Sequence, residues 1–321
     1  MTHTPAPLPT RPPFEKRETS RPQSIMHMGG TILSIDIAVH PSMGWPAVVA
    51  VEASLTTMDK PHVFVRTYNP VTRRWGSTQS IGSQGTALFS RFRTAQIAIS
   101  ADNTIHLVWG PGQIPKLGLY AIESHDYGES WSSPRVIAHQ SYGVFDIAAA
   151  ADGSVFVLAN SEAKQHPLII RRSSQGQWQP PEVLAMPSWY GSTGALSIAG
   201  EGQQANITLV TTGGGGSSTD NSLFSAQRKG PNGLWNLEHH LVKTDKIDLL
   251  THVRAIPLPD GTLFTFAMDA HNNVYALRIR NGQRQPIMQV VQGSGQQTPY
   301  IAAAYDPVSY THLTLPTNRE V

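Results

Sequence analysis

The chain has 321 residues, of which 40% are hydrophobic and only 14% are charged, and its formal net charge is +2. So small a charge gives no basic surface for nucleic acid, and no apolar run reaches the roughly 18 residues that a membrane-spanning helix needs. The chain has no cysteine, which excludes disulfides, thiolate nucleophiles and cysteine-ligated zinc. Its 27 Gly and 24 Pro favour many turns over long helices.

Residues 1–23 are rich in Pro and Arg and contain no apolar stretch like that of a secretory signal. We therefore predict that they form a disordered lead. The compartment depends on whether a signal segment lies outside this chain. With one, the protein is expected outside the cell or on its surface, and without one in the cytoplasm.

A short apolar segment recurs along the rest of the chain, roughly every 50 residues. The clear copies have the form Ile-Ala-x, and they begin at Ile37, Ile97, Ile147 and Ile301. Looser copies begin at Leu196 and Arg254. We interpret each copy as the first strand of a repeating unit.

Three of these segments are followed by a tight turn and then by a second apolar run. The turns contain Asp-Asn or Asp-Gly, pairs that accept a positive φ, at Asp102, Asp152 and Asp260. Third strands are predicted over residues 63–67, 118–123, 168–172, 223–227 and 274–278. Fourth strands are predicted over residues 135–138, 182–185, 240–242 and 287–291.

Four antiparallel strands in about 50 residues are typical of a β-propeller blade. A lone four-stranded sheet cannot bury both of its faces, so the sheets must stack around an axis. A tryptophan also recurs at the same phase of each unit, at Trp75, Trp131, Trp178 and Trp235. A β-sandwich would explain the alternating pattern but not these in-phase tryptophans.

The predicted fold is therefore an all-β propeller of four-stranded antiparallel blades over residues 24–307, six-bladed and with the last blade truncated. Residues 24–35 are expected to supply an outer strand that closes the ring. After Pro307 the pattern stops where a second strand is due. Residues 308–321 resemble translated adaptor sequence, and we expect this tail not to be native.

One motif is sharp. Residues 124–131 have the pattern Ser-x-Asp-x-Gly-x-x-Trp, at the predicted hairpin between the third and fourth strands of the second blade. Ser124 and Asp126 are suited to hydrogen bonds with the backbone of their own hairpin, and Gly128 to a positive φ. Trp131 is suited to burying a large ring against the next sheet. The motif is thus expected to be structural.

These residues resemble the Asp-box of sialidase-type (bacterial neuraminidase repeat) propellers, and degenerate copies occur at residues 69–75, 173–178 and 231–235. The resemblance covers roughly residues 30–307, and it implies a propeller that acts on or recognises carbohydrate. The family's sialidases clamp a substrate carboxylate with three arginines and use a Tyr–Glu pair and an Asp. At least two of these elements are not located in this sequence, because the matching positions hold His252, Asn160, and Met268 or Asp269. Its catalytic residues stay unassigned.

Candidate ligand residues lie in loops at the end of the propeller opposite the Asp-box hairpins. Aromatic rings there would stack on sugar C–H surfaces, and charged groups would bind hydroxyls or a carboxylate. The candidates are Arg91, Arg93, Tyr142, Trp189, Tyr190, Arg254 and Asp269. Arg254, on an inner strand, either binds ligand or pairs with Asp248 or Asp260. Neither a cofactor nor a metal is expected.

Two functions remain open. The first is a sialidase-like glycoside hydrolase with an incomplete catalytic signature. The alternative is a non-catalytic propeller that binds a glycan, a glycoconjugate or a protein. An enzyme needs an acidic pair, or Tyr with a carboxylate, converging across about 5–9 Å, so an acidic pair near Arg254 or Arg91 would discriminate between them.

Overall fold

The computed structural model describes residues 24–26, 29–53, 62–83, 95–110, 118–139, 141–161, 166–185, 194–199, 205–213, 222–230, 232–241, 250–258, 262–269, 271–280, 283–293, 302–306 and 310–314. These residues form β-strands and turns, and no helix occurs among them. The strands make up six antiparallel sheets, each built from consecutive segments of the chain. The all-β prediction is confirmed.

The first sheet contains β1 (Thr31–Val39), β2 (Pro46–Ala53), β3 (His62–Asn69), β4 (Arg74–Trp75) and β5 (Gln79–Ser83). The second contains β6 (Ala95–Ile99), β7 (Ile105–Trp109), β8 (Gly118–Ser124) and β9 (Arg135–His139). The third contains β10 (Ser141–Ala149), β11 (Val155–Ser161), β12 (Pro167–Arg172) and β13 (Glu182–Val183).

The fourth sheet contains β14 (Gly194–Ala199), β15 (Asn206–Gly213), β16 (Ser222–Lys229) and β17 (Asn236–Leu241). The fifth contains β18 (Leu250–Pro257), β19 (Leu263–Asp269), β20 (Val274–Arg280), β21 (Gln283–Arg284) and β22 (Met288–Val291). The sixth has two described strands, β23 (Ala302–Asp306) and β24 (Tyr310–Thr314).

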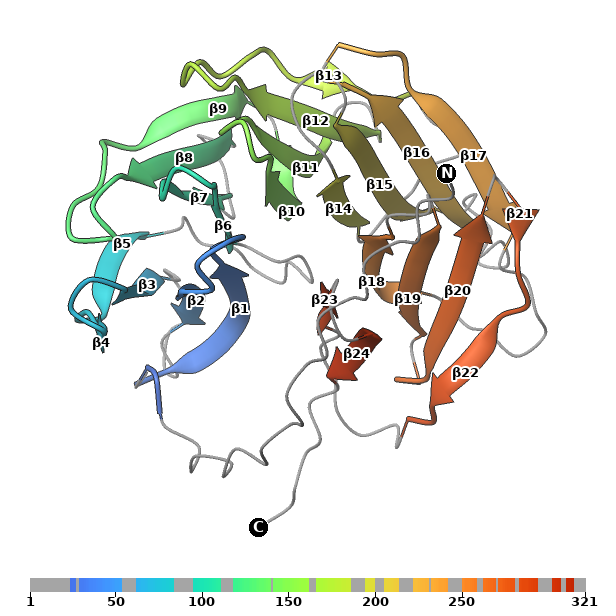
Figure 1. Ribbon diagram of the computed structural model, residues 1–321, viewed down its shortest axis with the longest axis horizontal. Coiled ribbons are helices and arrows are strands. Elements are labelled where there is room, and N and C mark those ends of the chain that lie inside the picture. Colours follow the sequence, from blue (N-terminus) through green and yellow to red (C-terminus); the bar gives the residue numbers. More distant parts are fainter. Residues whose placement is uncertain are drawn as a thin grey trace, which may run out of the picture.

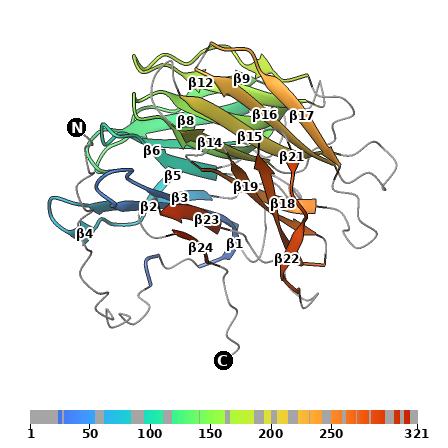
Figure 2. The ribbon, with the colours of Figure 1, turned by 45° about the vertical axis from the view of Figure 1, so that its right-hand side comes forward.

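The sheets follow one another around an arc in chain order, with the first strand of each sheet on the inside (Figure 1). The inner strands β1, β6, β10, β14, β18 and β23 contact one another in that order. Figure 2 shows the faces of neighbouring sheets packed against one another. This arrangement is a β-propeller, in which the described residues form five sheets of four or five strands and two strands of a sixth.

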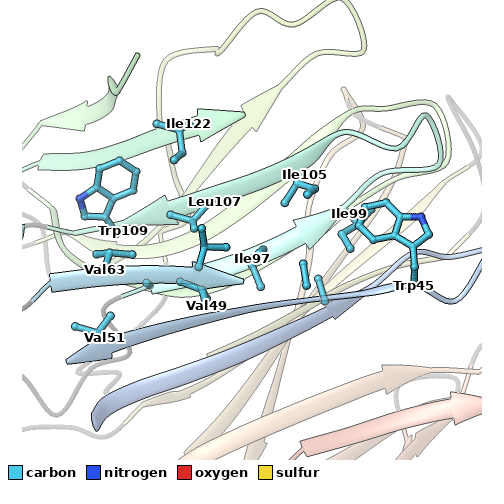
Figure 3. Close-up of a cluster of buried hydrophobic side chains, with 14 residues drawn as sticks. Trp45, Val49, Val51, Val63, Ile97, Ile99, Ile105, Leu107, Trp109 and Ile122 are labelled. Atoms are coloured by element: carbon cyan, nitrogen blue, oxygen red, sulfur yellow. The ribbon is translucent and has the colours of Figure 1, made fainter. Parts of the chain in front are cut away.

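Buried aliphatic side chains fill the space between consecutive sheets. Between the first and second sheets, Val49 and Val51 of β2 and Val63 of β3 pack against Ile97 and Leu107 (Figure 3). Side chains alternate between the two faces of a strand, so the neighbours of these residues serve the opposite interface. Burying each such side chain contributes about 1.5–3 kcal/mol, and separate clusters fill the next three interfaces.

Two of the three predicted tight turns are confirmed. Asp102 Oδ1 accepts the Thr104 N–H (3.1 Å), and Asp152 Oδ1 accepts the Ser154 N–H (2.9 Å). Between each Asp and its partner lies a residue of positive φ, Asn103 at 68° in the first turn and Gly153 at 80° in the second. The turn at Asp260 lies outside the described residues.

The structure corrects several predicted boundaries. Residues 31–35 do not belong to an outer strand, because they form the start of β1 and pair with β2. The fourth strand of the fourth sheet begins at Asn236 rather than at residue 240, and that of the third sheet covers only residues 182 and 183. Within the tail expected not to be native, residues 310–314 form β24 and pair with β23. The origin of that tail stays a prediction.

The sequence prediction for β18, the first strand of the fifth sheet, is out of phase by one residue. Alternation places Val253 and Ala255 in the interface between the fourth and fifth sheets, whereas Arg254 lies on the opposite face of β18. When the sequences of the third and fifth sheets are aligned on their Asp-Gly pairs, Ala255 matches Ile147 and Arg254 matches Asp146. The prediction that Arg254 begins an Ile-Ala-x copy was wrong by one position.

A largely buried ion pair joins the second sheet to the third, with the side chains of Arg172 and Glu123 10% and 16% exposed. Arg172 on β12 donates two hydrogen bonds to Glu123 on β8, at 2.5 Å from Nε to Oε1 and 2.6 Å from Nη2 to Oε2. The buried His106 lies beside this pair, with Nδ1 at 3.9 Å from Glu123 Oε1 and Nε2 at 3.1 Å from Ser100 Oγ. Burial and then the charge of Arg172 lower the pKa of His106 to about 3.

The neutral state of His106 makes folding sensitive to pH. Its pKa is about 3 in the folded chain against 6.5 for the unfolded reference, so only the unfolded chain gains a proton as the pH falls through that window. This stabilising contribution is complete above pH 6.5 and is lost towards pH 3. Between pH 6.5 and pH 5 we expect a loss of roughly 1.5 kcal/mol in the free energy of unfolding from this residue.

Urea unfolding of the wild type and of His106→Gln at the two pH values measures this contribution. The variant should lose roughly 1.5 kcal/mol less than the wild type on acidification. An identical pH dependence in the two proteins would contradict the assignment.

Candidate functional site

The Ser-x-Asp-x-Gly-x-x-Trp segment forms a self-bonded hairpin after β8. Ser124 Oγ donates to Asp126 Oδ1 (2.8 Å) and accepts the Gly128 N–H (2.8 Å). The Asp126 carboxylate accepts the Ser130 N–H (2.9 Å) and hydroxyl (2.5 Å). Slight burial raises the pKa of Asp126, but the hydrogen bonds from Ser130 and Ser124 outweigh it and lower that pKa below its ordinary value. Asp126 therefore acts as an ionised acceptor within its own turn.

The same hairpin attaches the second sheet to the first. Gly128 has φ = 87° and lies against Thr67 of β3, where a Cβ on Gly128 would come within 2.6 Å of Thr67 Cγ2. Trp131 Nε1 donates to Gln79 Oε1 (3.0 Å), and Gln79 Nε2 donates to the Gly128 carbonyl (2.7 Å). The hairpin thus joins two sheets through contacts that Ser124 and Asp126 hold in place.

The four in-phase tryptophans occupy equivalent hairpins of four consecutive sheets, as the sequence predicts. The residue after the tryptophan donates its N–H to a third-strand carbonyl, Gly76 to Thr67, Ser132 to Glu123 and Gln179 to Arg171. Trp131, Trp178 and Trp235 each pack on the cluster shared with the preceding sheet. All four rings are partly buried rather than fully buried.

Two aspartates on inner strands join neighbouring sheets near the axis. Asp36 Oδ2 accepts the Ile97 N–H (3.0 Å), and Asp146 Oδ2 accepts the Leu196 N–H (2.9 Å). Arg254 lies here too, with Nη1 at 3.9 Å from Asp146 Oδ2. The expected partners of Arg254, Asp248 and Asp260, lie outside the described residues.

Asp269, another predicted ligand residue, is buried at the end of β19. Its carboxylate accepts the N–H groups of His271 and Asn273 at 2.9 Å and the Tyr275 hydroxyl at 3.0 Å. Burial, and then the bond to Asp269, raise the pKa of Tyr275 to about 12. By accepting these hydrogen bonds, Asp269 closes the turn between β19 and β20.

The remaining candidates cannot be compared with the structure. Tyr142 lies on β10, but its side chain is outside the described part of the chain. The other four also fall outside it, and they are Arg91, Arg93, Trp189 and Tyr190. Of the predicted ligand residues, the structure therefore places the side chains of Arg254 and Asp269, and these two serve different contacts.

A groove lies between the first and second sheets, at the end of the propeller that carries the hairpins. Its volume is about 300 Å³. Both sheets contribute side chains that suit a polar ligand with an apolar face: Asn69, Arg74, Trp75, Gln79, Tyr127 and Glu129. We call these six residues the hairpin groove.

Contacts within the protein fix most of the hairpin groove. Asn69 Nδ2 donates to Glu129 Oε1 (3.1 Å) and so joins the two walls. Trp75 packs edge-on against Tyr68, with ring centroids 5.8 Å apart, and Tyr127 packs edge-on against Trp45 at 5.5 Å. Both aromatic rings are thereby held by a second ring, which lowers the entropy cost of binding. Arg74 is exposed.

Sequence reasoning missed this groove because it assigned the hairpin tryptophans a structural role and placed the ligand at the opposite end. The available signal was the first hairpin, where Trp75 follows two arginines, Arg73 and Arg74. What the sequence does not show is that Tyr127 and Glu129, more than fifty positions later, form the other wall.

Within the described ranges, no group of three or more His, Asp or Glu side chains is placed to hold a metal ion. Over the same residues, no helix has the length and apolar character needed to cross a membrane.

No family model and no curated protein matches this chain. Among solved structures, the chain is similar to the BP39L lectin from Burkholderia pseudomallei, with a TM-score of 0.58 and 14% identity over 85% of this chain and 74% of the lectin. The fucose-specific lectin from Aleuria aurantia has a TM-score of 0.52 and 14% identity, over 82% of this chain and 78% of that one. Another structure of an Aleuria aurantia lectin is described as a six-bladed β-propeller.

A sialidase has the same architecture. The K499G mutant of NanB sialidase from Streptococcus pneumoniae is similar at a TM-score of 0.57 and 9% identity, over 88% of this chain and 64% of the sialidase. Identities this low show the fold and not the activity. The chain therefore has a sialidase-like β-propeller fold, which it shares with lectins as well as with a sialidase.

Proposed function

We propose that this propeller is a carbohydrate-binding protein and that its ligand lies in the hairpin groove. The observation that carries the proposal is the pairing of two fixed aromatic rings, Trp75 and Tyr127, with the cation of Arg74 and the carboxylate of Glu129 around one groove. The lectin structures that share this fold support a glycan as the ligand class.

The chemistry of the groove fits a sugar ring. An aromatic face offers a surface for the C–H side of a pyranose, while a carboxylate and an amide accept or donate hydrogen bonds to its hydroxyls. The volume of about 300 Å³ is at the lower end for ligand pockets, which suits one or two sugar rings. Arg74, which is exposed, would donate to ring or hydroxyl oxygens or to a sugar carboxylate.

The described residues favour binding over hydrolysis. Near the axis, the carboxylate beside Arg254 is that of Asp146, and its oxygens accept the Ile147 and Leu196 N–H groups. Asp126, in the conspicuous motif, is likewise occupied by its own hairpin. Sialidase-like hydrolysis remains the second candidate function, supported by the shared fold with NanB.

Replacing Trp75 with alanine should weaken sugar binding at least tenfold, about 1.4 kcal/mol, because the stacking surface is lost. A glycan array with the labelled full chain identifies the ligand, and calorimetric titration of the best glycan gives the affinity. Trp178→Ala is the matched control, since it removes an indole from the equivalent hairpin of the third sheet, away from the groove. Its affinity should stay within about twofold of the wild type.

Equal losses in the two variants, or none in Trp75→Ala, would place the ligand elsewhere. Turnover of a fluorogenic sialoside by the wild type would favour the hydrolase instead.

A further inference from the structure

The hairpin between β16 and β17 of the fourth sheet contains an Asn-Gly pair, Asn232–Gly233. Asn232 lies in the turn with an exposed side chain, and Gly233 follows it outside the strands. Glycine is required at position 233, because an added Cβ would overlap the Lys229 carbonyl oxygen. The backbone nitrogen of Gly233 is therefore not shielded by a side chain.

The Gly233 N–H differs from the glycine N–H groups of the preceding hairpins. Gly176 of the third sheet donates its N–H to the Ser173 carbonyl, and Gly128 of the second donates to Ser124 Oγ. Among the described residues, no acceptor binds the Gly233 N–H. This nitrogen is thus available as a nucleophile towards the side chain that precedes it.

An arginine of the third sheet holds the side-chain carbonyl of Asn232. Arg171 Nη1 donates to Asn232 Oδ1 at 3.0 Å. The guanidinium is itself packed, with Cζ 5.9 Å from the centroid of the Phe156 ring. A charged donor on Oδ1 makes Cγ more electrophilic and stabilises negative charge on that oxygen. The two sheets together thus assemble a nucleophile, an amide carbon and a donor for the oxyanion.

We propose that Asn232 is a site of self-deamidation, promoted by Arg171 in the folded chain. The Gly233 nitrogen attacks Asn232 Cγ and loses its proton to water, while the electron pair of the carbonyl moves to Oδ1 beside Arg171. The Cγ–Nδ2 bond then breaks, Nδ2 takes a proton from water and leaves as ammonia, and a succinimide remains. Water opens this ring at one of its two carbonyls and gives aspartate or isoaspartate.

The reaction changes the charge of the interface between the third and fourth sheets. The Glu182 carboxylate already binds Arg228 Nη1 and Trp235 Nε1, both at 2.8 Å. Arg171 has no ion pair among the described residues, and its acceptor is the neutral amide of Asn232. Aspartate at position 232 supplies a carboxylate there, so a neutral hydrogen bond between two sheets becomes a charge-assisted one.

Peptide mapping of the full chain by mass spectrometry, after incubation at mildly alkaline pH, measures the conversion of Asn232. The rate should be higher in the folded chain than in concentrated urea. Arg171→Met should slow the folded rate about tenfold, less than the loss of a donor costs in a water-excluded active site, and should leave the rate in urea unchanged. Asn69 should stay intact, because the nitrogen of the following Pro70 carries no hydrogen.

Arg278→Met is the matched control, because it removes a guanidinium that lies 5.1 Å from the Phe264 ring centroid in the fifth sheet. It should leave the rate at Asn232 unchanged. Arg171→Lys keeps a cationic donor and should give a rate between those of the wild type and Arg171→Met. Circular dichroism shows that each variant is folded during the incubation.

Three results would overturn the proposal: an unmodified Asn232 in the folded wild type, a folded rate below the rate in urea, or a folded rate that Arg171→Met does not slow. None of these measurements depends on sugar binding.

Discussion

Replacing Arg172 with methionine should lower the free energy of unfolding by about 3–5 kcal/mol, because the Glu123 carboxylate is then left in the interface without its partner. Both hydrogen bonds of the pair are short, and Arg172 is 8% exposed. Burial, the largest of the causes that lower the pKa of the neighbouring His106, remains in the variant, so we expect its imidazole to stay neutral at pH 7 and not to replace the lost cation. Urea unfolding of the wild type and the variant at pH 7 gives the value.

The double variant Arg172→Met with Glu123→Leu serves as the control. Removing both charges from a buried site often costs little, so this variant should recover most of the lost stability. A loss below about 1 kcal/mol in the single variant, as for an exposed ion pair, would show that water still reaches Glu123.

Gly128→Ala should lower the free energy of unfolding by about 2–4 kcal/mol. Part of the cost arises because alanine is strained at φ = 87°, and about 1 kcal/mol is typical of such strain. The rest arises because the new methyl group overlaps Thr67 on the first sheet, and overpacking costs about 1–3 kcal/mol.

Gly176→Ala is a matched control that separates backbone strain from the overlap with Thr67. Gly176 occupies the corresponding hairpin of the third sheet with φ = 85°, but the nearest atom to its added Cβ is the flexible end of Arg172, at 3.3 Å. Only the strain should remain, about 1 kcal/mol. Equal losses of unfolding free energy in the two variants would show that a methyl group at position 128 does not overlap the first sheet.

Local chemistry made much of the fold predictable. Turn residues such as Asp102 and Asp152 act through atoms two positions away, so their effect can be inferred from short stretches of sequence. Nearly continuous apolar runs likewise mark strands whose two faces are both buried, as in β6 and β7. The one-residue error at Arg254 arose because its own neighbours, Val253, Ala255 and Ile256, are all apolar, so alternation alone does not show which of them faces the preceding sheet.

The hairpin groove was not predictable in the same way. Trp75 and Tyr127 become neighbours only because the second sheet packs on the first, through contacts such as Trp131 with Gln79. The exposure of Ile37 was not predictable either, because its sequence context matches that of the buried Ile97 and only the neighbouring sheet differs. Properties of an interface depend on both of its sides, whereas the sequence pattern describes one side at a time.

Fluorine NMR of the chain labelled with 5-fluorotryptophan tests the central claim most directly. The seven tryptophans give separate signals that single Trp→Phe variants assign. On titration with the glycan that binds best, the account predicts a shift of the Trp75 signal while that of Trp178 stays in place. A shift of the signal of Trp189, a ligand residue that the sequence predicts for the opposite end of the propeller, with Trp75 unchanged would contradict it.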